Sequence, residues 1–208
     1  MGTNGYDAEL DRQVGTIEER YGDLAGVDRE RLMSSVEKLR GLLPDAATPV
    51  ASGENLPFVV VVRSTLVPTV AAVERLQVKG KAGWTDMADE LDGYRPIEGV
   101  EVPDADAYLL VDVSTGPETL NVTPADALPR ITQAGRTPLT IDEGVALLTH
   151  HPEVLTERNA FQALASRADN KRVPSFWTSK GAPRLGWCWQ GNPHSWLGAA
   201  SAAQRLAP

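Results

Sequence analysis

The stretch that most constrains the fold is an unbroken apolar run at residues 56–62, LPFVVVV. Valine and phenylalanine favour extended structure, and a run without polar alternation is typical of a strand buried on both faces. We therefore expect a central strand here, with Arg63 at its carboxyl end. Residues 108–113, YLLVDV, predict a second buried strand. Asp112 is expected at its end, because an unpaired acid inside a buried strand is costly.

Helical patterns accompany these strands. The spacing of apolar residues predicts a helix over residues 7–20. Asp28 is the expected N-cap of a second helix, so the chain should begin with a helical pair. Thr123 is the expected cap of a later helix. Thr140 and Glu143 form a capping box, the clearest helix start in the chain.

A tryptophan-rich segment at residues 171–198 holds four of the five tryptophans. Leu185, Trp187 and Trp189 alternate with other residues, and this period of two indicates a strand. Residues 173–178 are expected to pair with it, because the segment between them has the composition of a turn. We expect Trp187 and Trp189 in the core, since a tryptophan buries a large area. A stacking wall for a planar ligand is the alternative.

These elements predict an α+β fold in a single domain over residues 6–200. It comprises a small mixed β-sheet flanked by helices, with an N-terminal helical pair and a C-terminal Trp-rich β-hairpin. A length of 208 residues suits one domain. Residues 1–5 are expected to be a disordered tail, residues 45–55 a flexible link, and residues 201–208 a flexible tail.

Composition narrows the class of protein. The net charge is −8, which argues against nucleic acid as a partner, because non-specific binding to DNA needs a basic surface. No apolar run approaches the ~20 residues of a membrane span, so no membrane partner is expected. The first residues are polar and acidic, unlike a signal peptide. One cysteine fits a reducing compartment, so we expect a cytoplasmic protein.

Charge is distributed unevenly along the chain. Residues 158–208 carry seven bases and a single acid, Asp169, whereas the rest of the chain is strongly acidic. The basic segment could bind a small anionic ligand, or it could dock onto the acidic remainder of the same chain. Both interpretations stay open from the sequence.

The candidate site residues come from this basic, aromatic segment and from one helix end. Arginine and lysine bind carboxylate or phosphate groups, and tryptophan stacks on rings. The candidate ligand-binding residues are Lys180, Arg184, Arg172, Trp177 and Trp196. The candidate catalytic residues, for proton transfer, are His194 and His150.

Other chemistry is considered and not expected. Cys188 and His194, with one of the two adjacent histidines His150 and His151, could bind zinc. A lone cysteine is more often a small buried apolar residue, and a mid-strand position does not suit a nucleophile. We expect no metal and no cofactor. The segment at residues 79–84, KGKAGW, has two lysines among glycines and is a weak anion-binding signal; we expect a flexible, solvated loop there. The oligomeric state is left open.

Residues 137–155, TPLTIDEGVALLTHHPEVL, and 179–198, SKGAPRLGWCWQGNPHSWLG, resemble an uncharacterised bacterial domain family that is common in actinobacteria and has no assigned activity. The resemblance extends from the first helix almost to the end. It implies a single cytosolic domain and no catalytic residue. The expected function therefore comes from the residues: an enzyme acting on a small anionic or aromatic metabolite, or a non-catalytic small-molecule or protein binding module that uses the same surface.

Overall fold

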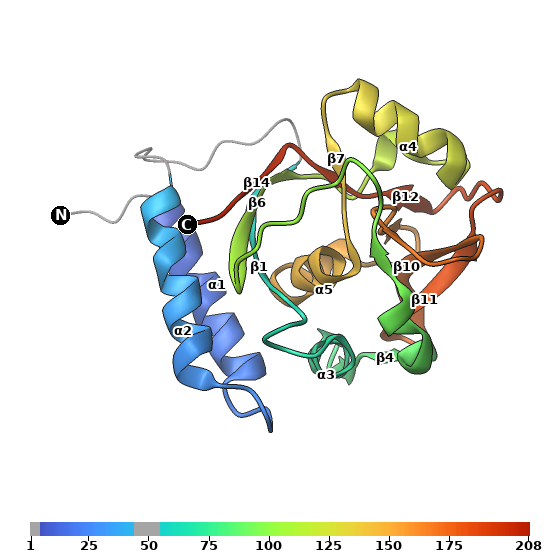
Figure 1. The fold of residues 1–208 in the computed structure, drawn as a ribbon. Helices are drawn as coiled ribbons and strands as arrows, with labels where there is room; N and C mark the ends of the chain where they lie inside the picture. Colours follow the sequence, from blue (N-terminus) through green and yellow to red (C-terminus); the bar gives the residue numbers. More distant parts are fainter. Residues whose placement is uncertain (1–4, 44–54) are drawn as a thin grey trace.

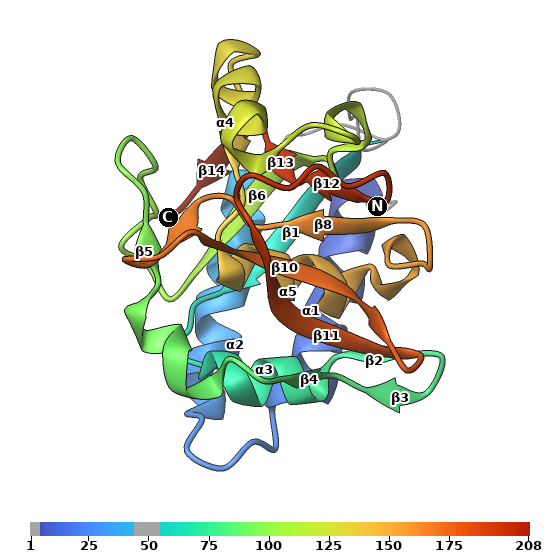
Figure 2. The ribbon, with the colours of Figure 1, turned by 90° about the vertical axis from the view of Figure 1, so that its right-hand side faces the viewer.

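Helix α5 (Ile141–His150) lies at the centre of the molecule, between two β-sheets (Figure 1). The computed structural model describes residues 5–43 and 55–208. Two N-terminal helices cover the outer face of one sheet, and α5 covers its inner face. The second sheet packs against the other side of α5 (Figure 2). This layering confirms the predicted α+β fold.

The two main sheets differ in strand direction. A three-stranded antiparallel sheet has the order β1-β6-β14, and a five-stranded mixed sheet has the order β12-β8-β10-β11-β4. Their strands are β1 (Leu56–Val62), β6 (Ala107–Val113), β14 (Gln204–Leu206), β12 (Leu197–Ala199), β8 (Ala160–Gln162), β10 (Arg172–Ser179), β11 (Ala182–Trp189) and β4 (Trp84–Thr85).

Shorter elements connect and cover these sheets. Three two-stranded pairs join β2 (Gln77–Val78) with β3 (Lys81–Ala82), β5 (Arg95–Pro96) with β9 (Ser166–Arg167), and β7 (Thr137–Pro138) with β13 (Ser201–Ala202). The remaining α-helices are α1 (Gly5–Tyr21), α2 (Arg29–Glu37), α3 (Thr69–Arg75) and α4 (Pro124–Gln133). The 3₁₀ helices are η1 (Lys38–Leu42), η2 (Ala88–Gly93), η3 (Pro117–Thr119) and η4 (Pro152–Val154).

The predicted N-terminal helical pair is present as α1 and α2 (Figure 1). Asp28 caps α2, because its carboxylate accepts the backbone N–H of Arg31 at 3.0 Å. The tail predicted at residues 1–5 and the link predicted at residues 45–55 lie outside the described residues, apart from one residue of each.

Helix α5 begins where the capping box predicts. The Thr140 hydroxyl accepts the Glu143 N–H, and the Glu143 carboxylate accepts the Thr140 N–H at 2.7 Å. Gly144 lets the helix approach the second sheet closely, because a Cβ atom there would stand 2.3 Å from the ring of Phe176. The helix is therefore fixed both at its start and along its side.

Asp112 is the next-to-last residue of β6, so it lies at the strand end as predicted. It is nevertheless only 9% exposed, and its φ angle of 54° is left-handed. Arg136 compensates the buried charge, with an N–O distance of 2.7 Å between the two side chains. A local pattern could not predict this, since the compensating residue lies outside the strand.

Residues 201–208 differ from the prediction. They were expected to be a flexible tail, but they include β13 and β14, and β14 pairs with β6 in the three-stranded sheet. Arg205 reaches from β14 to Glu143 on α5. Three residues of a short strand give too little periodicity to reveal such pairing from sequence.

The hairpin itself is confirmed as β10 and β11, paired from Arg172 to Ser179. Its core residues are Phe176 and Leu185, both 0% exposed. The prediction that Trp187 and Trp189 are core is wrong for Trp189, which is 47% exposed. Trp187 is half-buried. The alternation of apolar residues along β11 extends beyond the part of the strand that lies in the core. The same face of the strand therefore has a buried residue, Leu185, and an exposed one, Trp189.

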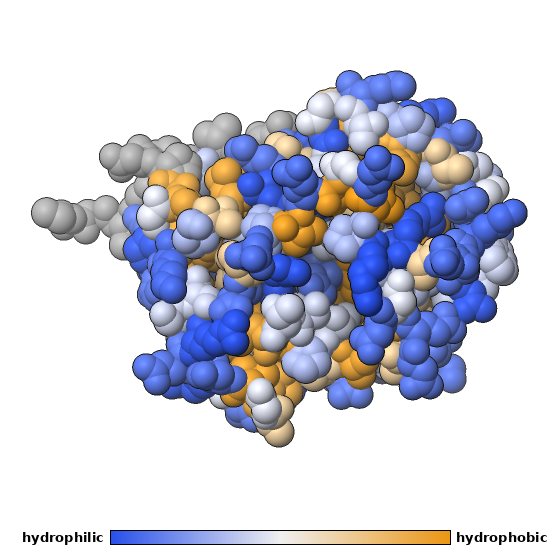
Figure 3. Space-filling view, in the orientation of Figure 1, coloured by the Kyte–Doolittle hydropathy of each residue, from blue (hydrophilic) through white to orange (hydrophobic). Residues whose placement is uncertain are grey.

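The face of the molecule drawn in Figure 3 is mostly hydrophilic, and its apolar residues form small patches between charged side chains. No broad apolar surface is visible on this face. Within the described residues, no helix is long and apolar enough to cross a membrane.

Candidate functional site

The predicted ligand-binding residues of the hairpin are held by contacts within the chain. Arg184 lies between two indole rings, with its guanidinium carbon 4.6 Å from the Trp84 centroid and 4.7 Å from that of Trp177. Its side chain also donates to Asp86 at 2.5 Å. Cation–π stacking and an ion pair thus fix Arg184 on the outside of β11.

Arg172 is arranged in the same way. It donates to both carboxylate oxygens of Glu90, at 2.6 and 2.9 Å, and stacks on Trp187 at 4.4 Å. Trp187 meets Trp189 edge to face at 4.8 Å. The basic segment therefore docks partly onto acids from residues 86–90, which is one of the two interpretations that the sequence left open.

His194 and Trp196 lie apart from these arginines. Their rings meet edge to face at 5.4 Å in the connection between β11 and β12, and His194 Nε2 is buried without a hydrogen-bond partner among the described residues. The sheet order places β8 and β10 between β12 and β11. The backbone oxygen of His194 accepts the N–H of Asn121 at 2.8 Å, and its ring contacts Trp196. No contact joins His194 to Arg184 among the described residues.

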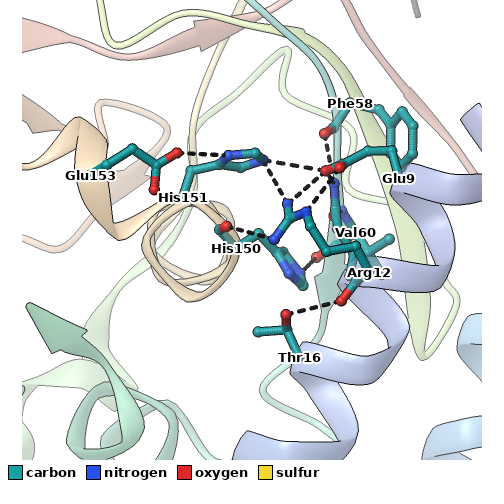
Figure 4. Close-up of polar contacts among 9 residues, drawn as sticks. Glu9, Arg12, Thr16, Phe58, Val60, His150, His151 and Glu153 are labelled. Atoms are coloured by element: carbon teal, nitrogen blue, oxygen red, sulfur yellow. Dashed lines mark hydrogen bonds and ion pairs between the residues drawn. The ribbon is translucent and has the colours of Figure 1, made fainter. Parts of the chain in front are cut away.

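His150, the other predicted catalytic residue, is 4% exposed. Its Nε2 atom lies 2.9 Å from the backbone oxygen of Val60, as Figure 4 shows. Burial lowers its pKa to about 3, so the ring is neutral and Nε2 donates this hydrogen bond. Its catalytic role stays a prediction. Its position in the structure is that of a residue that holds α5 against β1.

The neighbouring His151 belongs to a surface network (Figure 4). Its ring contacts Arg12 at 3.3 Å and Glu153 at 3.1 Å, and Arg12 also donates to Glu9 and to the backbone oxygen of His150. These contacts tie α1 to the end of α5. They hold the two helices in place around the sheet edge.

A cleft of about 550 Å³ opens between the end of β1, the start of α3 and the start of α5. We call it the β1–α5 cleft. Its lining residues are Arg63, Ser64, Thr65, Pro68, Thr69, Val70, Ala88, Leu91, Asp92, Tyr94, Arg95, Pro96, Val102, Thr140, Ile141, Asp142 and Ser166. Small-molecule sites in proteins are usually clefts of this size that combine apolar walls with a few polar groups.

Two arginines of the cleft, Arg63 and Arg95, form no ion pair with a carboxylate in the part of the chain that the structure describes. Arg63 donates from Nη1 to the backbone oxygen of Pro103 at 3.0 Å, and its Nε is buried without a partner among the described residues. Arg95 donates to the backbone oxygen of Tyr94 at 2.8 Å. Ten other arginines form ion pairs with Asp or Glu. Positive charge is therefore available in this cleft, whereas at most other arginines it is neutralised.

The start of α5 brings both signs of charge to the cleft, because its first turn holds the carboxylates of Asp142 and Glu143. The aligned peptide dipoles of a helix place partial positive charge at its N-terminus. Thr140 and Ile141, the cap and first residue of α5, both line the cleft. Their own N–H groups are already bonded to Glu143 and Ser166, so neither is a free donor.

Asp142 is one of two acidic residues that line the cleft, with Asp92. Its carboxylate accepts the backbone N–H of Ser64 at 3.0 Å, the Ser64 hydroxyl at 2.9 Å and the Thr69 hydroxyl at 3.3 Å. Burial raises its pKa above the ordinary value in spite of these hydrogen bonds, and the nearby charge of Glu143 adds to the effect. An oriented carboxyl group with a raised pKa is suited to proton transfer.

Behind Asp142 lies an interior cavity of about 10 Å³, which Asp142 shares with Thr149 and His150. A space of this size with polar walls is large enough for one water molecule. It is too small for a metabolite, so His150 cannot contact a ligand from this side.

Lys180 is the one predicted ligand-binding residue that lines a described cavity. This second cavity, of about 650 Å³, lies at the tip of the hairpin and contains neither histidine. The predicted site residues are therefore distributed over separate places. Arg63 was seen in the sequence only as the end of a strand, and Arg95 fell in a stretch with loop composition.

The geometry gives little support for a metal site or for a reactive cysteine. Within the described residues, no group of three or more His, Cys, Asp or Glu side chains could hold a metal ion. Burial raises the pKa of Cys188, which disfavours the reactive thiolate.

Comparison with known proteins adds a family but no characterised relative. Residues 16–208 match the model of a protein family. No curated protein and no solved structure matches the chain.

Proposed function

The chain belongs to DUF5701, a family of unknown function, and from this premise we propose that it binds a small organic anion in the β1–α5 cleft. The observation that carries the proposal is the pair Arg63 and Arg95, which line one cleft without a carboxylate partner among the described residues. Guanidinium groups bind carboxylate and phosphate in bidentate geometry, so they suit such a ligand.

The walls of the cleft indicate what else the ligand carries. Val70, Leu91, Val102 and Ile141 offer apolar surface, and the hydroxyls of Thr65 and other residues offer hydrogen bonds. A bare inorganic ion would leave most of a volume of about 550 Å³ unused. A metabolite with one anionic end and an apolar body would use both kinds of wall.

The ligand class is the one expected from the sequence, but the location differs. The hairpin arginines Arg172 and Arg184 already pair with Glu90 and Asp86, so a ligand would have to displace these acids. The cleft requires no such displacement. It is therefore the better place for an anion.

An enzyme is the second candidate, and Asp142 is the observation that favours it. A carboxyl group with a raised pKa, held by Ser64 and Thr69 in the cleft that Arg63 and Arg95 also line, could exchange a proton with a bound substrate. A non-catalytic binding protein would need the arginines but not this carboxyl group. Substitution Asp142→Asn separates the two, because it should abolish turnover and leave affinity for the substrate largely intact.

The binding proposal is tested with sulfate as the probe. We expect sulfate to raise the melting temperature more than chloride does at matched ionic strength. Sulfate also stabilises proteins non-specifically, so the measured quantity is the difference between variants. The extra stabilisation should shrink in Arg63→Gln and in Arg95→Gln, because each removes one guanidinium from the cleft.

The matched control is Arg130→Gln. Arg130 is exposed on α4, does not line the cleft, and forms no ion pair with another described residue. It should respond to sulfate as the parent does. Equal responses in all four proteins would mean that the cleft is not an anion site. Native mass spectrometry of the protein from its own host would then be used to identify the retained metabolite.

A further inference from the structure

Two hairpin turns lie side by side at one end of the molecule, where β2–β3 and the tip of β10–β11 meet (Figure 2). Both turns have a lysine followed by a glycine in the left-handed conformation: Lys79 and Gly80 have φ angles of 51° and 76°, and Lys180 and Gly181 have 54° and 77°. Two-residue turns of this kind fix the register of a hairpin. The backbone positions of Lys79 and Lys180 are therefore fixed by the two turns.

A direct contact joins the two turns. Lys81 Nζ donates to the backbone oxygen of Lys180 at 2.7 Å. The contact occupies Lys81 and leaves the ammonium groups of Lys79 and Lys180 without a carboxylate partner among the described residues. Lys79 and Lys180 both line the cavity of about 650 Å³, which we call the lysine groove.

Acidic residues line the same groove from another element. Glu153 belongs to η4, and Glu157 follows in the connection to β8. Glu153 pairs with His151, whereas Glu157 forms no ion pair with another described residue. Neither glutamate lies within 4 Å of Lys79 or Lys180, since no such pair is found among the described ion pairs. The two signs of charge are separated within one groove.

Apolar residues also line the groove. Val78 and Leu155 are 7% and 3% exposed, and both line the groove. Pro152 and the stem of Thr178 add to this lining. An aliphatic group placed here would be removed from water without displacing any protein side chain.

We propose that the lysine groove binds a small zwitterion of dipeptide size, with its carboxylate at Lys79 and Lys180 and its ammonium group at Glu157. Its aliphatic side chains would lie against Val78 and Leu155. The charges of the groove complement both ends of such a molecule, and a simple anion or cation would meet repulsion from one of the two sets. This site is separate from the β1–α5 cleft, and the inference does not rest on the function proposed there.

The test uses the dipeptide Leu-Leu and two blocked forms of it, N-acetyl-Leu-Leu and Leu-Leu amide. Binding is followed by the amide resonances of Val78, Leu155 and Gly181 in NMR titrations. We expect Leu-Leu to give saturable shifts at these residues. Each blocked form lacks one charge, so its affinity should fall at least tenfold.

Substitutions assign the two ends of the ligand. In Lys180→Gln, the preference for Leu-Leu over the amide should decrease, because the carboxylate partner is lost. In Glu157→Gln, the preference over the acetylated form should decrease instead. Both side chains are exposed, so the fold should persist, and unchanged amide resonances outside the groove verify this. Lys171→Gln, an exposed lysine on the other end of the hairpin, is the matched control and should bind as the parent does.

Three outcomes would overturn the proposal. Leu-Leu could give no saturable shifts in the groove, the blocked forms could bind as well as Leu-Leu, or both groove variants could keep the discrimination of the parent. The lysine groove and the β1–α5 cleft share no lining residue. The two proposals can thus fail independently.

Discussion

At the scale of single residues, two side chains complete the free edge of β1. Gln13 accepts the N–H of Val60 at 2.7 Å and donates to the backbone oxygen of Phe58 at 3.1 Å, and His150 donates to the oxygen of Val60. Unpaired backbone groups at a buried edge are costly. These residues therefore do for β1 what a fourth strand would do.

The neutral state of His150 predicts a pH dependence of stability. Its pKa is about 3 in the folded protein and about 6.5 when unfolded, so unfolding takes up a proton between these values. This contribution is complete above pH 6.5 and is lost at about 1.4 kcal/mol per unit as the pH falls. From pH 7 to pH 5, the parent should lose about 2 kcal/mol more than His150→Gln, by urea denaturation. Parallel pH profiles would contradict the assignment.

Some residues of the two proposed sites could be predicted from the sequence, and others could not. Lys180 was a candidate for anion binding and the segment at residues 79–84 a weak signal for it, but only the fold shows that they meet in one groove. Arg63 and Arg95 carry no local signal, because an arginine that pairs with an acid has the same sequence context as one that does not. Whether a charge is neutralised depends on residues far away in the chain.

At the scale of elements, local signals were reliable wherever a few neighbouring residues determine the structure. The capping box at Thr140 and the cap at Asp28 formed as predicted, since each is a contact between residues three apart. The hairpin formed with a turn shorter than expected, at Lys180 and Gly181. Which part of a strand is buried depends on the elements that pack against it, and these cannot be read from the strand itself. For this reason the prediction that Trp189 is a core residue was wrong.

Substitutions in the hairpin should change the free energy of unfolding by different amounts for a buried residue and for an exposed one. Phe176→Ala should destabilise the protein by roughly 3–5 kcal/mol, because it leaves a cavity against α5. Trp189→Ala should cost about 1 kcal/mol or less, as for other surface substitutions. Urea denaturation midpoints measure both. A large loss for Trp189→Ala would indicate that a partner or a second copy covers this side chain in solution.

At the scale of the whole molecule, the C-terminal strand β14 links the three-stranded sheet to the central helix α5. Arg205 on β14 donates to Glu143 on α5 at 2.5 and 2.8 Å, and the two side chains are 6% and 0% exposed. Tyr108 on β6 donates to the same carboxylate at 2.8 Å. One buried ion pair thus joins the three-stranded sheet to the central helix. It also pairs a base of the basic segment, Arg205, with an acid of the acidic remainder, Glu143.

Removal of one partner of this pair should be severe. Arg205→Ala leaves the Glu143 charge buried without compensation, which typically costs roughly 3–5 kcal/mol. The control is Arg29→Ala, whose ion pair with Glu18 is exposed and should be worth about 0–1 kcal/mol. Thermal unfolding of both variants gives the comparison. The double variant Arg205→Met with Glu143→Gln should recover part of the loss, since no charge is then left buried.

The order of the strands along the chain has a consequence during synthesis on the ribosome. β6 is the middle strand of its sheet, yet its neighbour β14 is translated long after it, beyond residue 203. At about 5–20 residues per second, one edge of β6 waits on the order of 5–20 s for its partner. During that time the nascent chain presents an open strand edge of apolar residues, which is a site for chaperone binding or for misassembly between neighbouring nascent chains.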